Sequence, residues 1–130
     1  MQQATHLEPV FHPFGTIPGL PFSEAVEVGD LLFLSGQIGT DTNGKLVAGG
    51  IADETRNALA NIGRVLARHG SAMERVVKVT VMLADMAEWP AMNAEYVKFF
   101  AKNPPARSAF GCNGLAMKAR VEIECVALRK

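Results

Sequence analysis

The sequence predicts an α+β fold, a two-layer sandwich in which a mixed β-sheet carries two helices on one of its faces. Segments of alternating apolar and polar residues, which are typical of strands, lie near both ends of the region that follows residue 21. Two segments with apolar residues at helical spacing lie between them. An amphipathic helix must bury its apolar stripe, and a sheet face provides the surface that it needs.

Length and composition restrict the classes of protein to which the chain can belong. With 130 residues, 48% of them hydrophobic, the chain fits one globular domain with a real core. Thirteen Lys and Arg balance thirteen Asp and Glu, and this zero net charge argues against nucleic acid as the main partner. No apolar stretch approaches the length of about 20 residues that spans a bilayer, and the first residues lack the pattern of a signal peptide. We therefore expect a cytoplasmic protein that does not act on a membrane.

The first 21 residues differ in composition from the rest of the chain. Prolines and glycines recur in this segment, at Pro9, Pro13, Gly15, Pro18, Gly19 and Pro21. Proline removes a backbone donor and disfavours helix. The pattern therefore predicts an extended N-terminal leader over residues 1–21, lying on a single domain that covers residues 22–130.

The first strands are predicted to form a hairpin. Residues 24–28 alternate between apolar and polar types, and residues 31–34 are apolar throughout. The dipeptide Gly29-Asp30 between them is typical of a two-residue turn. Because the second strand is apolar at every position, both of its faces are expected to be covered.

The clearest helix is predicted over residues 52–69. Its apolar residues fall at helical spacing, namely Leu59, Ile62 and Leu66 with Ala58 and Val65 beside them. Asp53 is the candidate N-cap, because a short acceptor side chain can bond the free N–H groups of the first turn. Gly70 is the expected stop, since glycine adopts the left-handed conformation that ends many helices.

A strand and a second helix follow. Residues 75–83 alternate, and the apolar side chains expected to share one face are Val77, Val79, Val81 and Leu83. The second helix is marked by apolar residues at helical spacing, namely Trp89, Met92, Tyr96 and Phe99. Asp85 lies upstream as a candidate cap, and Pro90 falls in the first turn, where proline is tolerated.

The last two strands are predicted at residues 108–112 and 121–128. Apolar residues occur on both faces of the predicted sheet, because some point opposite to the other apolar residues of their strands: Leu32 and Leu34, and Val126 and Leu128. The helices cover only one face. We therefore expect the second face to pack on another copy of the chain, with grooves between the subunits of a homo-oligomer.

The sequence contains none of the common catalytic motifs, neither a nucleophile elbow nor a phosphate-binding loop nor a zinc-binding HExxH. His6 and His12 lie in the leader and His69 lies at a helix end, so no metal site is expected. Cys112 and Cys125 lack the spacing of a redox or metal motif. They are expected to be reduced thiols in or near the core.

What remains is a set of polar residues in apolar surroundings. Arg107 follows a Pro-Pro-Ala segment, and a guanidinium held at the start of a strand is suited to bind a carboxylate through two hydrogen bonds. A carboxyl group nearby, such as that of Glu122, can orient or activate water. Structural alternatives remain open: an ion pair between Arg107 and Glu122 or Glu124, a backbone hydrogen bond for Asn93, and a bulge at Ser35-Gly36.

These residues lie in segments that resemble the Rid family of reactive intermediate (imine) deaminases, also called YjgF/UK114 or L-PSP proteins. The resemblance covers nearly the whole chain from about Pro21. It rests on four segments in their order and spacing, namely Leu34-Ser35-Gly36-Gln37-Ile38, the run from Asn93 to Phe100, Pro105-Ala106-Arg107-Ser108, and the run from Val121 to Ala127. Each segment alone is weakly specific, but the combination is strong.

The resemblance implies a homotrimer of chorismate-mutase-like subunits, in which the sheets form an inner barrel and clefts lie between neighbours. It also implies hydrolysis of a 2-imino acid, or of its enamine tautomer, to a 2-keto acid and ammonia, with water as the nucleophile and no cofactor. Arg107 would clamp the substrate carboxylate, and Glu122 and Ser35 would complete the catalytic set. The remaining substrate-binding positions would be Asn93, Gly36, Phe22 and Ala109.

Two positions depart from the family pattern. Phe22 stands where the best-known members carry tyrosine, and Ala109 stands where they carry cysteine. A trimer that binds a 2-keto acid without turning it over is therefore a second hypothesis. The ribonuclease or translation-inhibitor activity attached to some relatives is a third, and the zero net charge argues against it. A protein-holding chaperone role would leave no mark in the sequence.

Overall fold

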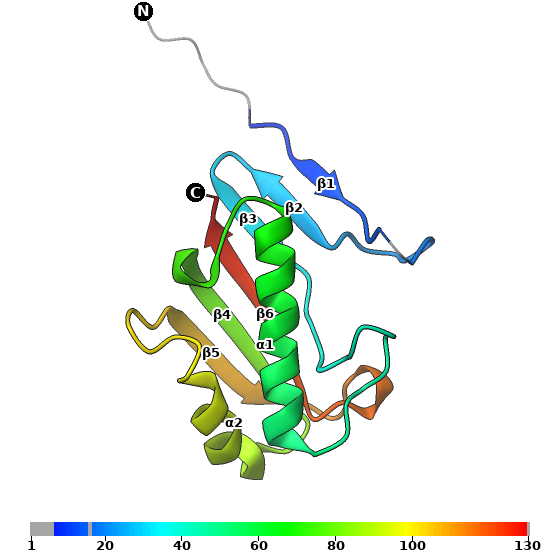
Figure 1. Ribbon diagram of the computed structural model, residues 1–130, viewed down its shortest axis with the longest axis vertical. Helices are drawn as coiled ribbons and strands as arrows, with labels where there is room; N and C mark the ends of the chain where they lie inside the picture. The colour runs from blue at the N-terminus through cyan, green and yellow to red at the C-terminus, as the bar shows by residue number, and fades with distance from the viewer. Residues whose placement is uncertain (1–6, 16, 130) are drawn as a thin grey trace, which may run out of the picture.

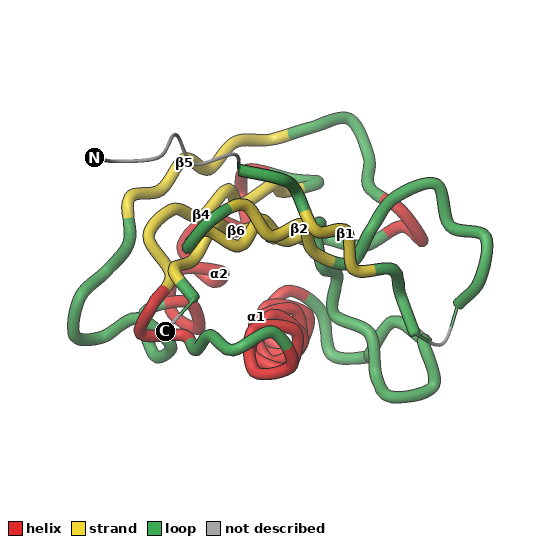
Figure 2. Tube along the Cα trace, turned by 90° about the horizontal axis from the view of Figure 1, so that it is seen from above, coloured by secondary structure: helices red, strands yellow, loops and turns green. Residues whose placement is uncertain are grey.

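The computed structural model describes residues 7–15 and 17–129, which form one six-stranded β-sheet with two α-helices. Figure 1 shows α1 lying over the sheet, and Figure 2 shows both helices on the same side of it. The predicted α+β sandwich is therefore confirmed. His6 and the first part of the predicted leader lie outside the described residues. No helix in the described part of the chain has the length and apolar character needed to cross a membrane.

The strands of the sheet are β1 (Val10–His12), β2 (Ala25–Val28), β3 (Leu31–Leu34), β4 (Val76–Leu83), β5 (Ala106–Gly111) and β6 (Val121–Leu128). Their order across the sheet is β1-β2-β3-β6-β4-β5. All neighbours are antiparallel except β4 and β5, so the sheet is mixed. A parallel pair needs a crossover connection. The segment between β4 and β5 supplies it and contains α2, which therefore lies near the β5 edge of the sheet (Figure 1).

The helix α1 spans Ile51–Arg68, so each boundary is one residue earlier than predicted. Asp53 is not its N-cap. The cap is Gly50, which enters the helix at φ 78° without a side-chain hydrogen bond, and Asp53 lies in the first turn. There it pairs with Arg56 and interacts favourably with the helix dipole. Gly70 follows the helix at φ 79°, the left-handed conformation expected of a stop.

The helix α2 spans Trp89–Tyr96, and Pro90 lies in its first turn as predicted. Phe99 lies beyond its end, because the chain after Tyr96 tightens into backbone bonds between residues three apart. Asp85 does not cap α2. It caps the 3₁₀ turn that precedes the helix, where its side chain accepts a hydrogen bond of 2.9 Å from the N–H of Ala87.

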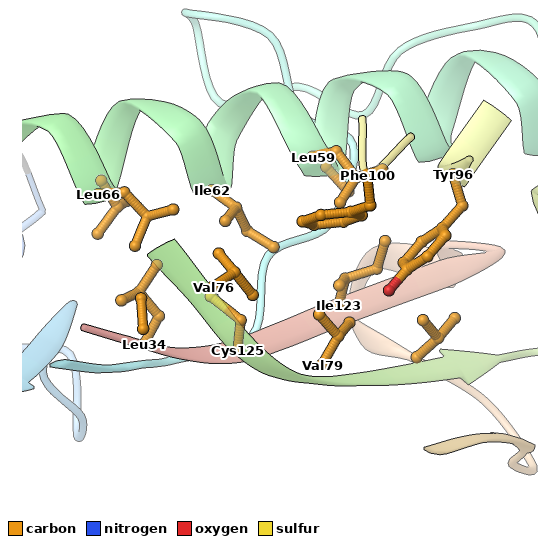
Figure 3. Close-up of a cluster of buried hydrophobic side chains, with 14 of the residues drawn as sticks. Leu34, Leu59, Ile62, Leu66, Val76, Val79, Tyr96, Phe100, Ile123 and Cys125 are labelled. Carbon is orange, nitrogen blue, oxygen red and sulfur yellow. The ribbon is translucent and has the colours of Figure 1, made fainter. Parts of the chain in front are cut away.

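The core lies between α1 and the sheet, as Figure 3 shows. The stripe predicted on α1 is fully buried, with Leu59 and Leu66 at 0% and Ile62 at 1% exposure. It belongs to one apolar cluster with the inward residues of β4 and β6, among them Val79 and Ile123. Each such side chain contributes about 1.5–3 kcal/mol through burial. This packing fixes α1 on the sheet and leaves the site residues to be placed by strand register.

A β-bulge in β4 alters the face of one predicted core residue. Val77 was expected in the core but is 42% exposed, and Val76 is buried in its place at 6%. The pairing of β4 with β6 shifts between Val76 and Lys78, so Val77 is the extra residue of the bulge. From Val79 to Leu83 the predicted inward face is confirmed.

The face of the sheet away from the helices is apolar as well. β1 extends the sheet from within the predicted leader, and its three-residue length gave no strand pattern in the sequence. Strand pairing aligns an apolar row across four strands, formed by Phe11, Val26, Phe33 and Val126. Phe11 is 63% exposed and Phe33 is 42% exposed. The described chain itself does not cover this face.

Candidate functional site

Arg107 lies on β5, on the face of the sheet that the helices cover. β5 begins at Ala106, two residues before the predicted strand, because its parallel pairing with β4 starts where Lys78 meets Ala106. The same register aligns Arg107 with the inward residue Val79. The side chain is half-buried, and its Nη1 donates a hydrogen bond of 2.7 Å to Oδ1 of Asn93 on α2.

The guanidinium of Arg107 has aromatic neighbours instead of a carboxylate. Its Cζ atom lies 4.6 Å from the ring centroid of Tyr96 and 5.4 Å from that of Trp89. Among the described residues, no Asp or Glu forms an ion pair with it. The alternative of an ion pair between Arg107 and Glu122 or Glu124 is therefore wrong. The alternative of a backbone hydrogen bond for the Asn93 side chain is also wrong, because its Oδ1 accepts from Arg107. A half-buried cation without a carboxylate partner is suited to bind an external anion.

Glu122 lies on the other face of the sheet. It is paired with Met82, and its neighbour Ile123 points into the core, so the Glu122 side chain points away from the helices. Its carboxylate fills the space beside Gly36, where a Cβ atom would overlap it. Burial raises the pKa of the Glu122 carboxyl above its usual range, and the charge of Glu124 raises it further. A carboxyl group with a raised pKa is suited to proton transfer near neutral pH.

The hydroxyl of Ser35 has a structural partner. Ser35 follows β3 directly, and its Oγ donates a hydrogen bond of 2.5 Å to the carbonyl oxygen of Ser23. Next to Ser23, the ring of Phe22 is 51% exposed and packs edge-to-face on Phe14, with 5.5 Å between the centroids. Ala109 lies on β5, in register with Val81, and packs against the core.

Five of the predicted site residues thus fall into two groups on opposite faces of the sheet. Arg107, Asn93 and Ala109 belong to the helix-covered face, whereas Glu122 and Gly36 meet on the open face. β4 lies between β5 and β6. Within one chain, Arg107 and Glu122 therefore do not face the same small molecule.

In the sequence, Trp89 and Tyr96 marked the apolar spacing of the second helix, and their contact with Arg107 was not predicted. Trp89, Asn93 and Tyr96 are separated by four and three positions, so they share one face of α2. That spacing was the available signal. It became informative only once the crossover had placed α2 beside β5.

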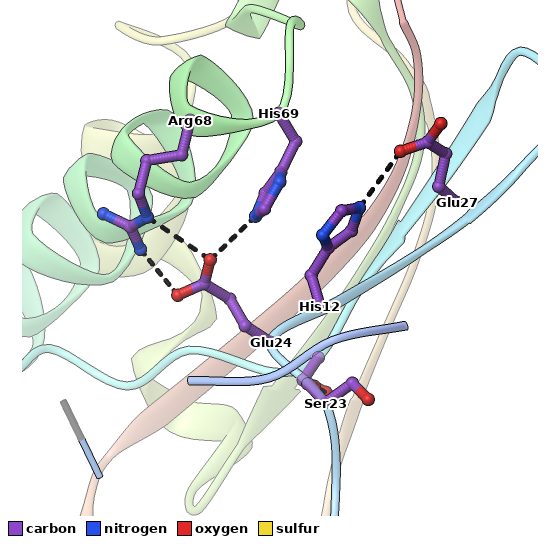
Figure 4. Close-up of polar contacts among 7 residues, drawn as sticks. His12, Ser23, Glu24, Glu27, Arg68 and His69 are labelled. Carbon is purple, nitrogen blue, oxygen red and sulfur yellow. Dashed lines mark hydrogen bonds and ion pairs between the residues drawn. The ribbon is translucent and has the colours of Figure 1, made fainter. Parts of the chain in front are cut away.

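A second polar cluster was also missed, because its members are far apart in the sequence (Figure 4). Glu24 is 6% exposed and accepts hydrogen bonds of 2.6 Å from Arg68 and 2.9 Å from His69. The ring of His69 stacks on that of His12 with centroids 4.3 Å apart, and His12 bonds Glu27 at 3.0 Å. These contacts tie β1 and β2 to the end of α1.

A cleft of about 510 Å³ opens beside this cluster, lined by Gln37, Asn61, Arg64, Arg68 and His69 among others. None of the predicted site residues lines it. Cys125 is buried, which raises the pKa of its thiol to about 12, and it forms no disulfide with Cys112. In the part of the chain that the structure describes, no three His, Cys, Asp or Glu side chains gather as metal ligands.

Comparison with known proteins places these features in context. Residues 16–129 match the family model described as endoribonuclease L-PSP. The chain is 43% identical to the human 2-iminobutanoate/2-iminopropanoate deaminase over 110 residues, which cover 84% of this chain and 80% of that protein. The solved structure of yeast YEO7 has a TM-score of 0.85 at 36% identity and covers 96% of this chain and 100% of its own. The Rid-family protein YyfA from Yersinia pestis has a TM-score of 0.85 at 30% identity, over 93% of this chain and 99% of its own.

Proposed function

The chain belongs to the endoribonuclease L-PSP family, also called the Rid or YjgF family, and on that premise we propose that it hydrolyses reactive 2-imino acids and their enamine tautomers to 2-keto acids and ammonia. Relatives that are 40% to 43% identical are named as imine or reactive intermediate deaminases, which supports this reaction. The observation that carries the proposal is Arg107, a half-buried guanidinium held by Asn93 with no carboxylate partner among the described residues.

Recognition of the substrate rests on its carboxylate. The planar guanidinium of Arg107 offers five N–H donors, and Asn93 occupies one of them. A 2-imino acid carries a carboxylate next to its C=N bond, so a two-point contact with Arg107 would fix the reacting carbon as well. The zero net charge of the chain provides no general attraction for anions. The substrate carboxylate must therefore be selected by a local positive charge, and Arg107 provides it.

The reaction needs few catalytic groups, because an imine carbon is already electrophilic. Water adds to the carbon of the protonated imine while a carboxylate accepts the proton that the water loses, and a neutral carbinolamine results. The carboxyl group returns this proton to the nitrogen, the C–N bond breaks and ammonia leaves, and the carboxylate accepts the hydroxyl proton as the C=O bond of the keto acid forms. Positioning of water and substrate lowers the barrier by several kcal/mol, about 7 or more in well-oriented cases. Glu122, with its raised pKa, is the proposed proton acceptor and donor.

Arg107 and Glu122 occupy opposite faces of one sheet, so the proposed site requires a second chain. We assign the open apolar face to the interface of a homotrimer, in which Arg107 of one subunit meets Glu122 of the partner subunit. The exposed side chains of Phe33 and Phe110, at 42% and 47%, support burial of this face in an assembly. The open face carries Gly36 and Glu122 into the same interface.

The test is imine hydrolysis by the purified protein. An amino acid oxidase generates 2-iminobutanoate, and its loss is followed with wild type, Arg107→Ala and Arg64→Ala. Arg64 is a matched control, because it is an exposed arginine that bonds Asn61 on its own helix. We expect the Arg107 variant to lose about 100-fold in kcat/KM and the Arg64 variant to match wild type.

Equal rates for wild type and Arg107→Ala would refute the proposal. Binding of 2-ketobutyrate by the wild type without any imine hydrolysis would favour the second hypothesis, a metabolite-binding trimer. In that outcome the missing hydroxyl at Phe22 is the first candidate cause, tested by Phe22→Tyr. RNA cleavage that survives both Arg107→Ala and further purification would favour the ribonuclease hypothesis instead.

A further inference from the structure

Arg107 is held in an unusual way for a half-buried arginine. Other arginines of this chain rest against carboxylates, as Arg68 does on Glu24 at 2.6 Å and Arg120 on Glu88 at 2.8 Å. Arg107 instead has two aromatic rings and one amide oxygen around it, all from one face of α2. These neighbours hold the Arg107 guanidinium without a carboxylate from the described residues.

The faces and the edges of a guanidinium bind different partners. Aromatic rings attract the cation through their negative faces, whereas carboxylates bind the N–H groups at its edges. A carboxylate from the protein would also hold Arg107, but it would occupy the edges that a substrate carboxylate needs. Rings hold the cation while leaving those N–H groups free.

We propose that Trp89 and Tyr96 are positioning residues, an aromatic seat that fixes the plane of the Arg107 guanidinium and keeps its edge open for the substrate carboxylate. This inference rests on the proposed function, because it assigns the seat to the same carboxylate site. Asn93 completes the seat by accepting a hydrogen bond from Nη1, which fixes the rotation of the guanidinium within its plane.

The ring of Tyr96, and not its hydroxyl, carries the effect. Tyr96 is 5% exposed, and its hydroxyl has no hydrogen-bond partner among the described residues. Burial raises the pKa of this hydroxyl, although the charge of Arg107 and the proximity of its N–H groups oppose the shift, so the group stays neutral at physiological pH. A phenylalanine at this position would supply the same ring to the guanidinium.

Four variants test the seat. Trp89→Leu and Tyr96→Leu remove one ring each, and Tyr96→Phe removes only the hydroxyl. Phe100→Leu is the matched control, because Phe100 is a buried ring in the same cluster, 4.9 Å from Tyr96, that makes no cation–π contact with Arg107. The readouts are the dissociation constant for 2-ketobutyrate by calorimetry, and kcat and KM for 2-iminobutanoate.

The two seat variants, Trp89→Leu and Tyr96→Leu, are each expected to weaken 2-ketobutyrate binding about fivefold or more and to raise KM similarly, with a smaller effect on kcat. Tyr96→Phe should match wild type, and Phe100→Leu should bind within about twofold of wild type even where it is less stable. Thermal unfolding of every variant separates loss of folded protein from loss of affinity. A Phe100→Leu effect as large as those of the seat variants, or a Tyr96→Phe effect as large as that of Tyr96→Leu, would overturn the proposal.

Trp89 also offers a spectroscopic test, because it is the single tryptophan of the chain. Its ring lies 5.4 Å from the Arg107 guanidinium, so a carboxylate bound there should change its emission. We expect 2-ketobutyrate to shift the emission of the wild type, and 2-butanone, which lacks the carboxylate, to leave it unchanged. No shift with saturating 2-ketobutyrate, or the same shift in Arg107→Ala, would contradict the seat.

Different experimental results would refute the proposed reaction and the aromatic seat. Absence of imine hydrolysis by the wild type, with seat-dependent 2-ketobutyrate binding intact, would refute the proposed reaction and leave the aromatic seat standing. Imine hydrolysis that depends on Arg107 but not on either ring would refute the seat and leave the reaction standing.

Discussion

Gly36 has no side chain because the carboxylate of Glu122 fills the space where one would lie. In Gly36→Ala, the added methyl group would displace that carboxylate, and a misplacement of about 1 Å can cost about 100-fold in rate. We therefore expect Gly36→Ala to lower kcat about tenfold or more in the imine assay. Gly63→Ala is the control. Gly63 lies within α1, and an added Cβ atom there would lie 3.8 Å from Sδ of Met73, an ordinary contact distance. The control should keep full activity, and equal losses in both variants would contradict this role of Gly36.

Glu124 sets part of the acidity of Glu122. Burial raises the pKa of Glu122 first, and the negative charge of Glu124 raises it further. If Glu122 must be ionised to accept a proton from water, activity falls as the pH drops through this raised pKa. Glu124→Gln removes one cause of the shift, so the acid limb of the kcat/KM profile should move to lower pH. Lys102→Gln, a charge change at an exposed residue of the loop before β5, serves as the comparison. An acid limb that does not move in Glu124→Gln would contradict the assignment.

The residues of the candidate site were easier to predict from the sequence than the faces of the sheet on which they lie. The alternation of residues 121–128 placed Glu122 opposite to the core, as the structure confirms. The face of Arg107 depends on the parallel register of β4 and β5, which joins segments about 30 residues apart and has no local signature in the sequence. The ion pair considered for Arg107 and Glu122 fails for that reason.

At the scale of elements, regular patterns were predictable and irregular ones were not. The stripe on α1 and the alternation of β6 match the structure, because both follow from strict periodicity and burial. The bulge at Val77 breaks the period of β4, and β1 is too short to show one. Pairing with β2, together with the His12 and Glu24 contacts shown in Figure 4, stabilises β1 on the sheet.

Glu24 is the centre of the contacts that join α1 to β2. Burial alone would raise the pKa of Glu24, but hydrogen bonds from Arg68 and His69 outweigh it and lower the pKa below the usual 4.5. A carboxyl with a lowered pKa contributes stability above its unfolded pKa, and this contribution is lost as the pH falls through the folded pKa. The groups around it are Arg68, His69, His12 and, one step further, Glu27 with Arg129.

We expect Glu24→Gln to lower the free energy of unfolding by about 1–3 kcal/mol at pH 7. The difference from wild type should shrink as the pH falls below 4.5, because the wild type then loses its own ionised carboxylate. Urea unfolding at fixed protein concentration measures both values. Glu74→Gln, at an exposed residue, should stay within about 0.5 kcal/mol of wild type throughout. A Glu24→Gln deficit that is constant from pH 7 to the acid range would contradict the linkage.

For the whole molecule, the sheet with helices on one face only is the decisive feature. The unbroken apolar run of β3 predicted two apolar faces, and the structure confirms that Leu32 and Leu34 are buried while Leu31 and Phe33 are exposed. The positions of Arg107 and Glu122 on opposite faces of the sheet could not be predicted from one chain's sequence. The two residues can form one site only when a second chain covers the open face. The proposed trimer therefore predicts that Arg107 and Glu122 act in the same site only when they come from different subunits.

Mixed trimers of two inactive variants test this composite site. In a cyclic trimer built from Arg107→Ala and Glu122→Gln subunits, every mixed assembly contains one interface that joins an intact Arg107 to an intact Glu122. Random assembly of equal amounts should restore about one quarter of wild-type imine hydrolysis, since about three quarters of the trimers are mixed and about a third of the sites in each are intact. The separate variants set the baseline, and native mass spectrometry verifies mixing. No gain in verified mixed trimers would mean that both residues of a site come from one chain, because only a site shared between subunits can be rebuilt by exchange.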